Sequence, residues 1–223
     1  MIKKNYINNK WVNSIDGDLF EVENPFTEKV ITKVPYCKEK DVDNAVNSAK
    51  LAWKNWKSIG SLDMRDLLRE VAVKSRINNR EIAEIIVAES GKPLIECLDE
   101  VEWISSIFEY YSEIGRDQKG RVVAPVTSRS ISMVIKESYG VVGCIVPWNY
   151  PLLLMAWKVA PALASGNTVV IKPSEYTPLS IMRWLQVACD HLPTGIINMI
   201  TGDGVTGSYL VEHPDTRVIA FTG

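Results

Sequence analysis

Four short stretches of the sequence place polar groups or glycine directly after an apolar run. They read P-W-N-Y-P at 147–151, K-P-S-E at 172–175, T-G-D-G at 201–204 and T-G at 222–223. In a parallel sheet covered by helices, ligands bind beyond the carboxyl ends of the strands, where such segments meet. Together the four segments predict one ligand-binding crevice, and they do so more strongly than any one of them alone.

The third segment opens the pattern Gly202-x-Gly204-x-x-Gly207, which follows an apolar run and leads into a helix. This is the context of a dinucleotide-binding turn, where glycines let the backbone approach a pyrophosphate at a helix N-terminus. An ordinary tight turn fits the pattern equally well. The acidic residue expected roughly 20 positions later is missing, because the next run ends in F-T-G at 221–223. A bound ribose would therefore need another carboxylate.

Glu175, three residues after Lys172, is the candidate for that carboxylate. A cation and a carboxylate so placed can both hydrogen-bond a diol such as a ribose. The alternative is an exposed ion pair worth under about 1 kcal/mol, and spacing alone favours this alternative.

Asn149 has two interpretations as well. It follows Pro147 and Trp148 and precedes Pro151, so the turn that holds it is stiff. Its amide could donate a hydrogen bond to a developing oxyanion. Its side chain could instead cap the following helix, which is the commoner use of asparagine and is favoured by the local sequence.

None of the four cysteines stands in a catalytic or metal-binding context. There is no C-x-x-C, and the two histidines show no metal-ligand spacing. A nucleophile needs an activating neighbour or electropositive surroundings. The sequence offers neither around Cys37, Cys97, Cys144 or Cys189. We therefore predict no metal site and no catalytic cysteine among these residues.

The elements that position these residues differ between the two halves of the chain. Of 223 residues, 52 are charged (25 basic and 27 acidic); 39 of them lie in 1–120 and 13 in 121–223. Short strands are expected within 6–34. The apolar spacing then predicts helices starting near 41 and over about 63–78, 80–90 and 93–114, followed by a hairpin of two β-like runs at 121–126 and 130–136.

After residue 139 short apolar runs alternate with helix-length segments. The runs do not alternate polar and apolar residues, which predicts a parallel sheet covered on both faces. Thr177 is expected to cap the second of these helices, with Pro178 at its first position, and Pro161 predicts a kink or break in the first. The runs cover 141–146, 168–171, 196–200 and 218–221, and the helices 151–165, 178–190 and 204–212.

Bulk composition excludes several classes of function. The net charge of −2 gives no indication of nucleic acid or an anionic membrane as a partner. No run reaches transmembrane length, and the N-terminus has no apolar signal region. These features predict a reduced, soluble, cytoplasmic protein.

The motifs together resemble those of the NAD(P)-dependent aldehyde dehydrogenase superfamily. The resemblance covers nearly the whole chain in family order. Its matching stretches are G-V-V-G-C-I-V-P-W-N-Y-P (140–151), W-K-V-A-P-A-L-A-S-G-N-T-V-V-I-K-P-S-E (157–175), L-P-T-G-I-I-N-M-I-T-G-D-G (192–204) and V-I-A-F-T-G (218–223).

The resemblance implies a Rossmann-like parallel sheet with flanking helices, incomplete at 139–223. A segment of strands and helices precedes it at 1–120, and the hairpin at 121–138 would be an oligomerisation arm for a homodimer or homotetramer. Asn149 would help to form the oxyanion hole for a thiohemiacetal. Lys172 and Glu175 would hold the adenosine ribose, and the glutamate favours NAD over NADP. The remaining cofactor-binding residues would be Val146, Pro147, Trp148, Gly204, Gly207, Phe221 and Gly223, facing the same crevice as Asn149.

Two departures from the family pattern limit the functional prediction. The family's nucleophilic cysteine and general-base glutamate lie beyond the F-T-G segment, so we expect these 223 residues alone to be inactive and the chain to be cut through a cofactor site. The glycine turn is also one residue tighter than usual. The leading interpretation is NAD-dependent oxidation of an aldehyde to a carboxylic acid. The alternative is a non-catalytic, truncated module that binds nucleotide or assembles with a partner.

Overall fold

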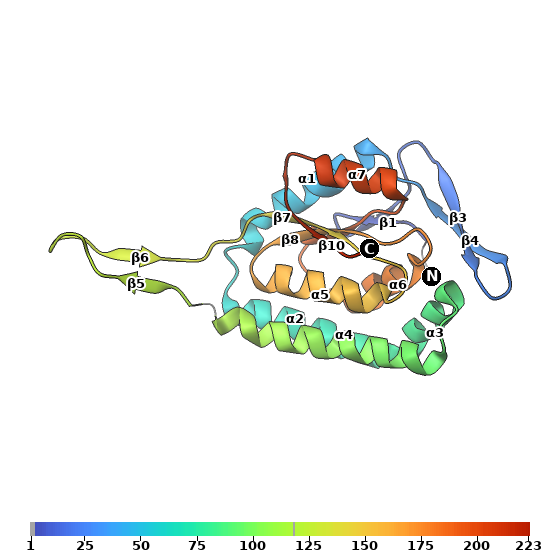
Figure 1. Ribbon diagram of the computed structural model, residues 1–223, viewed down its shortest axis with the longest axis horizontal. Coiled ribbons are helices and arrows are strands. Elements are labelled where there is room, and N and C mark those ends of the chain that lie inside the picture. The colour runs from blue at the N-terminus through green and yellow to red at the C-terminus, as the bar shows by residue number, and fades with distance from the viewer. Residues whose placement is uncertain (1–2, 118) are drawn as a thin grey trace.

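The centre of the molecule is a six-stranded sheet in the order β10-β7-β8-β9-β1-β2. The computed structural model describes residues 3–117 and 119–223 (Figure 1). The four strands β7 to β10 pair in parallel. The two N-terminal strands, β1 and β2, extend the sheet in antiparallel pairing. Their bounds are β1 (Asn5–Ile7), β2 (Lys10–Val12), β7 (Val141–Ile145), β8 (Thr168–Lys172), β9 (Ile197–Met199) and β10 (Thr216–Phe221).

Helices cover both faces of this sheet (Figure 1). On one face lie α1 (Glu39–Trp56) and α7 (Gly204–Glu212); on the other lie α5 (Pro151–Ala164) and α6 (Leu179–Ala188). A third layer packs on α5 and α6, so α5 is buried on almost every side. The third layer consists of α2 (Ser61–Ile77), α3 (Asn79–Ser90) and α4 (Leu94–Ile114), followed by the short 3-10 helix η1 (Gly115–Asp117). The predicted Rossmann-like fold class is confirmed.

Two hairpins extend from the body. The strands β3 (Leu19–Asn24) and β4 (Lys29–Pro35) form one, and β5 (Arg121–Val123) and β6 (Ser132–Val134) form the other. The β5–β6 hairpin projects well away from the sheet and helices (Figure 1), as the sequence predicted.

Some local predictions were wrong. The predicted break at Pro161 is absent, because α5 runs through this proline to Ala164; the predicted kink stays a prediction. Thr177 does not cap α6; Pro178 occupies the N-cap position, and the Thr177 hydroxyl makes no hydrogen bond with any described residue. Within the described residues, no helix combines the length and the hydrophobicity needed to cross a membrane.

Candidate cofactor crevice and neighbouring trough

The four strand-end segments line one crevice at the carboxyl edge of the parallel strands. Its volume is about 590 Å³. The walls include nine predicted residues, namely Val146, Pro147, Trp148, Lys172, Glu175, Gly204, Gly207, Phe221 and Gly223. They also include residues that were not predicted to bind the cofactor, among them Ile145, Ser174, Tyr176, Ser208 and Val211.

Lys172 ends β8 inside the crevice and is only 4% exposed. Its Nζ donates to the carbonyl oxygens of Pro173 at 2.7 Å and Gly202 at 2.8 Å. The Glu175 carboxylate lies 3.9 Å from this Nζ and is partly exposed. Burial lowers the pKa of Lys172, and Glu175 and Asp203 oppose that shift. The exposed-ion-pair interpretation is therefore wrong for Lys172, because a central strand carries it into the protein.

The glycines of the 202–207 turn have different surroundings. Gly202 has a φ of +150°, and a Cβ there would collide with the Thr206 side chain, so the fold itself requires this glycine. A Cβ at Gly204 would have no protein atom within 4 Å. A Cβ at Gly207 would lie 3.5 Å from Lys172 Cδ, which is an ordinary contact distance. Packing within the chain therefore does not require a glycine at 204, and open space remains at the start of α7.

A carboxylate already occupies the N-terminus of α7. Asp203 Oδ1 accepts hydrogen bonds from the Val205 amide at 2.8 Å and the Tyr36 hydroxyl at 2.9 Å. Burial raises the pKa of Asp203, but the hydrogen bonds from Tyr36 and Val205 outweigh burial and the net shift is downward. An ionised Asp203 offsets the positive end of the helix dipole. The helix-dipole argument for a pyrophosphate is therefore weaker here than the glycine pattern indicated.

The segment after β10 is tied to the neighbouring elements. The Thr222 amide donates to the Ile145 carbonyl at 3.2 Å, which continues the pairing of β10 with β7. Lys158 of α5 donates to the Thr222 hydroxyl at 2.6 Å. Phe221 is 66% exposed and forms part of the crevice wall.

Asn149 lies next to Trp148 in the chain but lines a second cavity of about 380 Å³. We call this cavity the trough; it lies between α4 and α5. Asn149 Oδ1 accepts a hydrogen bond from the Tyr150 amide at 3.0 Å, and Nδ2 has no hydrogen-bond partner among the described residues. Tyr150 occupies the N-cap position of α5, so the N-cap interpretation of Asn149 is wrong. The lining residues are Glu96, Asp99, Glu100, Trp103, Asn149, Tyr150, Leu153, Leu154 and Trp157.

Two buried glutamates, both missed in the sequence, cap the helices that follow β7 and β8. Glu100 Oε1 accepts from the Leu152 and Leu153 amides of α5 at 2.9 and 3.1 Å. Its other oxygen pairs with Lys92. These bonds fix the loop that carries Asn149 against α4. No local spacing could have shown this contact, because 52 residues separate Glu100 from Leu152.

Glu89 of α3 does the same for α6. Its oxygens accept from the Leu179 amide at 2.6 Å and the Ser180 amide at 2.9 Å. Burial raises the pKa of Glu89 to about 8, while the hydrogen bonds from Ser180 and Leu179 oppose the shift. Glu89 thereby ties the end of the loop 173–178, which carries Glu175, to α3.

The four cysteines are buried free thiols. Burial raises the pKa of Cys37 and Cys144 to about 12 and that of Cys97 to about 11, and it raises that of Cys189 as well. At neutral pH such thiols hold their protons and are poor nucleophiles. Among the described residues, no cluster of histidine, cysteine and carboxylate side chains could hold a metal ion.

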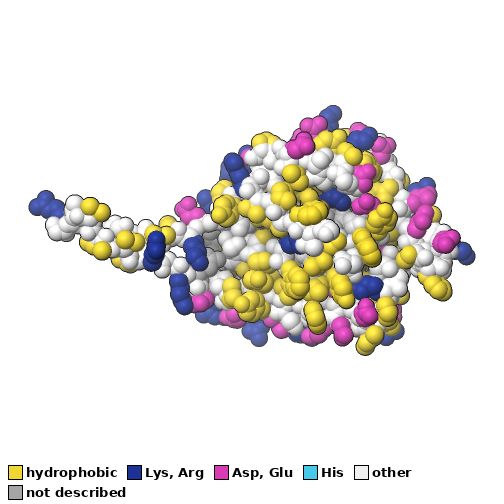
Figure 2. Space-filling model, viewed as in Figure 1, with side chains coloured by type: hydrophobic (Ala, Val, Ile, Leu, Met, Phe, Trp, Pro, Cys, Tyr) yellow, Lys and Arg dark blue, Asp and Glu magenta, His cyan; other side chains and the backbone are white. Residues whose placement is uncertain are grey.

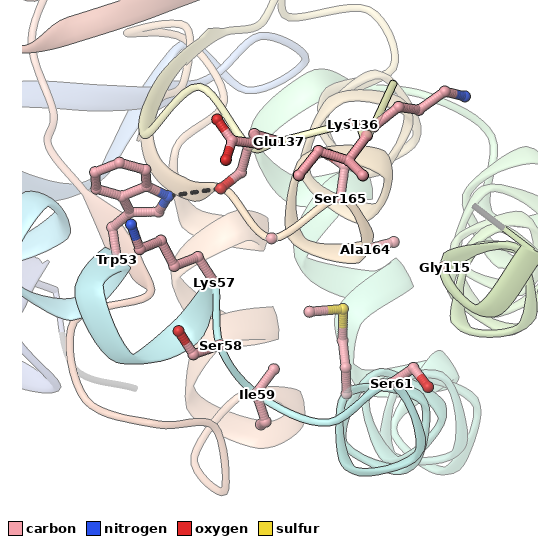
Figure 3. Close-up of a pocket in the computed structure, with 14 residues that line it drawn as sticks. Trp53, Lys57, Ser58, Ile59, Ser61, Gly115, Lys136, Glu137, Ala164 and Ser165 are labelled. Carbon is pink, nitrogen blue, oxygen red and sulfur yellow. Dashed lines mark hydrogen bonds between the residues drawn. The ribbon is translucent and has the colours of Figure 1, made fainter. Parts of the chain in front are cut away.

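A third cavity, of about 460 Å³, lies at the opposite, amino edge of the sheet. Figure 3 shows Trp53 directed toward the segment before β7, where its Nε1 donates to Ser138 Oγ at 2.8 Å. Lys57 lies over the Trp53 ring, 4.5 Å from the centroid. None of the predicted site residues lines this cavity.

Comparison with known proteins places this arrangement in a family. The model of the aldehyde dehydrogenase family matches residues 11–223. The chain belongs to the aldehyde dehydrogenase family. Among similar curated proteins, acetaldehyde dehydrogenase 2 of Cupriavidus necator is 36% identical over 99% of the chain and 44% of its own length. A D-glyceraldehyde dehydrogenase (NADP(+)) of Thermoplasma acidophilum is 36% identical over the whole chain and 46% of its own length.

Solved structures of aldehyde dehydrogenases share the fold of this chain. A point mutant of betaine aldehyde dehydrogenase from Staphylococcus aureus, in complex with NAD+, aligns with a TM-score of 0.95 at 31% identity. A putative aldehyde dehydrogenase from Burkholderia cenocepacia aligns with a TM-score of 0.96 at 36% identity. Each alignment covers all of this chain and 46% of the other. The chain thus spans less than half the length of these aldehyde dehydrogenases.

Proposed function

We propose that the protein containing this chain is an NAD-dependent aldehyde dehydrogenase that oxidises an aldehyde to a carboxylic acid through a thiohemiacetal. The observation that carries the proposal is the crevice: the open space at Gly204 lies beside the buried Lys172 and its partner Glu175. The family match makes an aldehyde the expected substrate.

The residues of the crevice fit a dinucleotide. Lys172 has three ammonium protons and uses two for the Pro173 and Gly202 carbonyls. The third and the Glu175 carboxylate are suited to the two hydroxyls of a ribose. Gly204 and Gly207 let the ligand approach the backbone of α7, and Val146, Pro147, Trp148, Phe221 and Gly223 supply the rest of the surface. Bound NAD would accept a hydride from the substrate.

Glu175 makes NAD the expected cofactor. A ribose 2′-phosphate beside this carboxylate would bring like charges together. The relatives include an NADP(+) enzyme, so the preference has to rest on residues of this chain. We expect NADP to bind more weakly than NAD, and Glu175→Gln to narrow the difference.

We propose that Asn149 donates a hydrogen bond to the oxyanion of the thiohemiacetal. Its Nδ2 is free to donate, its backbone is held by Pro147 and Pro151, and Glu100 fixes the start of α5 behind it. Removing a donor of this kind typically lowers kcat by about 10²–10³. The nucleophile would have to come from outside these 223 residues, because the four thiols here are buried. The family resemblance implies the same for the general-base glutamate.

Calorimetry with NAD and NADP, together with NADH production from an aldehyde, tests the proposal. The complete gene product should bind NAD more tightly than NADP and oxidise an aldehyde, while the 223-residue chain alone should produce no NADH. Tighter binding of NADP would contradict the role of Glu175. Nucleotide binding without oxidation by the complete gene product would favour the alternative, a non-catalytic nucleotide-binding module. Absence of both would leave an assembly role.

The β5–β6 hairpin is proposed as the contact between copies of the chain in a homodimer or homotetramer. It projects from the body (Figure 1) and exposes Val122, Val126 and Ile131 by 77%, 95% and 83%. An isolated two-stranded hairpin is at best marginally stable in water, so a second copy is the expected support. Ile131→Lys should shift the complete gene product toward monomer in light scattering. An unchanged mass would remove this role.

The free thiols fit the reducing cytoplasm, which we propose as the compartment of the protein.

A further inference from the structure

The glycine turn at 201–206 is held in place by a segment from the N-terminal part of the chain. This segment, 35–37, lies at the end of β4, and the hairpin before it carries charged side chains on its outer side (Figure 2). Three of its hydrogen bonds involve backbone groups of the segment: Thr201 Oγ1 donates to the Pro35 carbonyl at 2.5 Å, the Cys37 amide to the Thr201 carbonyl at 2.9 Å and Thr206 Oγ1 to the Cys37 carbonyl at 2.6 Å. The turn at the cofactor crevice is therefore anchored to the strand that ends at Pro35.

A further contact joins the side chains of Tyr36 and Asp203. Tyr36 Oη donates to Asp203 Oδ1 at 2.9 Å, and the same oxygen accepts from the Val205 amide at 2.8 Å. Tyr36 is held on its other side, because its amide donates to the Asp18 carbonyl at 2.8 Å and its ring lies edge-on to Phe20. Neither Tyr36 nor Asp203 lines the crevice, so both can act on a cofactor only through residues that do.

The residue that links them to the crevice is Gly202. A glycine with a φ of +150° has wide conformational freedom, so Gly202 does not by itself fix where its carbonyl points. The peptide between Gly202 and Asp203 is planar, so an Asp203 held by its side chain fixes the direction of that carbonyl. The Gly202 carbonyl accepts from Lys172 Nζ at 2.8 Å. The Tyr36 hydroxyl is thus connected to the Lys172 ammonium group through Asp203 and Gly202.

This connection determines how Lys172 presents its protons. An ammonium group turns about its Cε–Nζ bond and carries three donors. Two of them are taken by the carbonyls of Pro173 and Gly202, so the third has one direction left. If the Gly202 carbonyl rotated away, the ammonium group would turn freely and its hydrogen bond to a ligand would be less well directed.

We propose that Tyr36 and Asp203 are positioning residues for the cofactor, holding the Gly202 carbonyl against Lys172 so that the third ammonium proton points at the adenosine ribose. This inference rests on the proposed dinucleotide site and adds to it two residues that lie outside the crevice. The alternative is that Asp203 only caps α7. The hydrogen bond from Val205 alone would meet that role, and the Tyr36 hydroxyl would then be dispensable for the cofactor.

The test uses calorimetry on the complete gene product with two ligands. One is NAD, and the other is the NAD analogue whose adenosine ribose lacks both hydroxyls. The wild type should bind NAD about tenfold more tightly than the analogue. Tyr36→Phe keeps the cap of α7 but loses the hydroxyl, so it should weaken NAD by about threefold or more and leave the analogue unchanged.

Two further variants separate positioning from other effects. Tyr209→Phe removes a hydroxyl of α7 that makes no hydrogen bond with the described residues, and both affinities should stay at their wild-type values. Asp203→Asn keeps an oxygen for the Tyr36 and Val205 donors and should bind NAD within about twofold of the wild type, whereas Asp203→Ala should lose at least as much affinity as Tyr36→Phe. Equal losses in Asp203→Asn and Asp203→Ala would assign the effect to charge and overturn the positioning role.

The kinetics should show the same division. In Tyr36→Phe the KM for NAD should rise while kcat at saturating NAD stays unchanged, because the lost contact acts on binding and not on the chemical step. A Tyr36→Phe variant that keeps the wild-type preference for NAD, or that weakens both ligands equally, would overturn this inference and leave the proposed function standing. Equal binding of NAD and the analogue by the wild type would instead defeat the proposed ribose contact of Lys172, and the inference with it.

Discussion

The two edges of the parallel strands both carry a cavity, and the cavities have similar volumes of about 590 and 460 Å³. At the carboxyl edge the wall contains a buried lysine and a glycine with open space before it. At the amino edge the charged residues Lys57, Lys136 and Glu137 are exposed, and Trp53 already has its hydrogen bond. Cavity volume therefore says little about function here. The two edges differ instead in the buried Lys172 and in the open space at Gly204.

The outer helices explain why the carboxyl edge can hold its loops in place. Glu100 and Glu89 each supply a carboxylate to a helix N-terminus that has no cap of its own. If these contacts define the carboxyl edge, removing them should cost far more than removing a surface charge nearby.

The largest effect is expected for Glu100→Ala. It leaves the Leu152 and Leu153 amides without an acceptor and Lys92 without its partner. Breaking a buried pair in this way typically lowers the free energy of unfolding by about 3–5 kcal/mol. Urea unfolding measures the loss. The control is Glu102→Ala on the same helix, where only an exposed pair with Arg76 is lost and the cost should stay under about 1 kcal/mol. Similar losses in both variants would refute the capping role.

The next effect is a pH dependence that comes from Glu89. Burial raises its pKa from the ordinary 4.5 to about 8 in the folded protein. The folded state therefore binds the proton more tightly than the unfolded state. The resulting stabilisation is complete below about pH 4.5 and is lost as the pH rises through about 8. In between, the free energy of unfolding should fall by up to about 1.4 kcal/mol per pH unit.

Unfolding curves at several pH values test this slope. Glu89→Gln cannot titrate, so its slope between these pH values should be flatter than that of the wild type, whatever its absolute stability. Parallel slopes in the two proteins would show that Glu89 stays ionised, held by the Leu179 and Ser180 amides.

Two glycines two residues apart sharpen the difference between packing and binding. Gly202→Ala places a Cβ against Thr206 and should lower stability by about 1–3 kcal/mol. Gly204→Ala enters open space and should change stability by no more than about 0.5 kcal/mol. It should nevertheless weaken NAD binding by about tenfold, because a methyl group then occupies the crevice. Urea unfolding measures the stability of both variants, and calorimetry measures their affinity for NAD. Unaltered NAD affinity in Gly204→Ala would place the cofactor elsewhere.

The sequence predicted the parts of this molecule that depend on local pattern. The runs after residue 139 became parallel strands, and their ends came together at one crevice, because successive βα units place their loops on the same edge. The site of Asn149 could not be predicted in the same way. It lies in the trough rather than in the crevice, since α4 approaches α5 from a part of the chain some fifty residues earlier.

Capping shows the same limit. Thr177 and Asn149 have the residue types that usually cap a helix, yet α6 and α5 take their caps from Glu89 and Glu100. A buried carboxylate can satisfy two amides at once and therefore replaces a local hydroxyl or amide cap. Only the packing of α3 and α4 against these helices makes that possible, and packing of this kind leaves no spacing in the sequence.

The smallest effect should come from the amino edge. Ser138→Ala removes the acceptor of the Trp53 indole, which should lower the free energy of unfolding by about 1 kcal/mol. NAD affinity should stay at the wild-type value, because no residue of this cavity lines the crevice. Ser58→Ala, in the wall of the same cavity (Figure 3), is the control, since its hydroxyl makes no hydrogen bond with the described residues. If Ser138→Ala weakened NAD binding as much as Gly204→Ala does, the two edges would be coupled. The separation of structural and binding roles between them would then be lost.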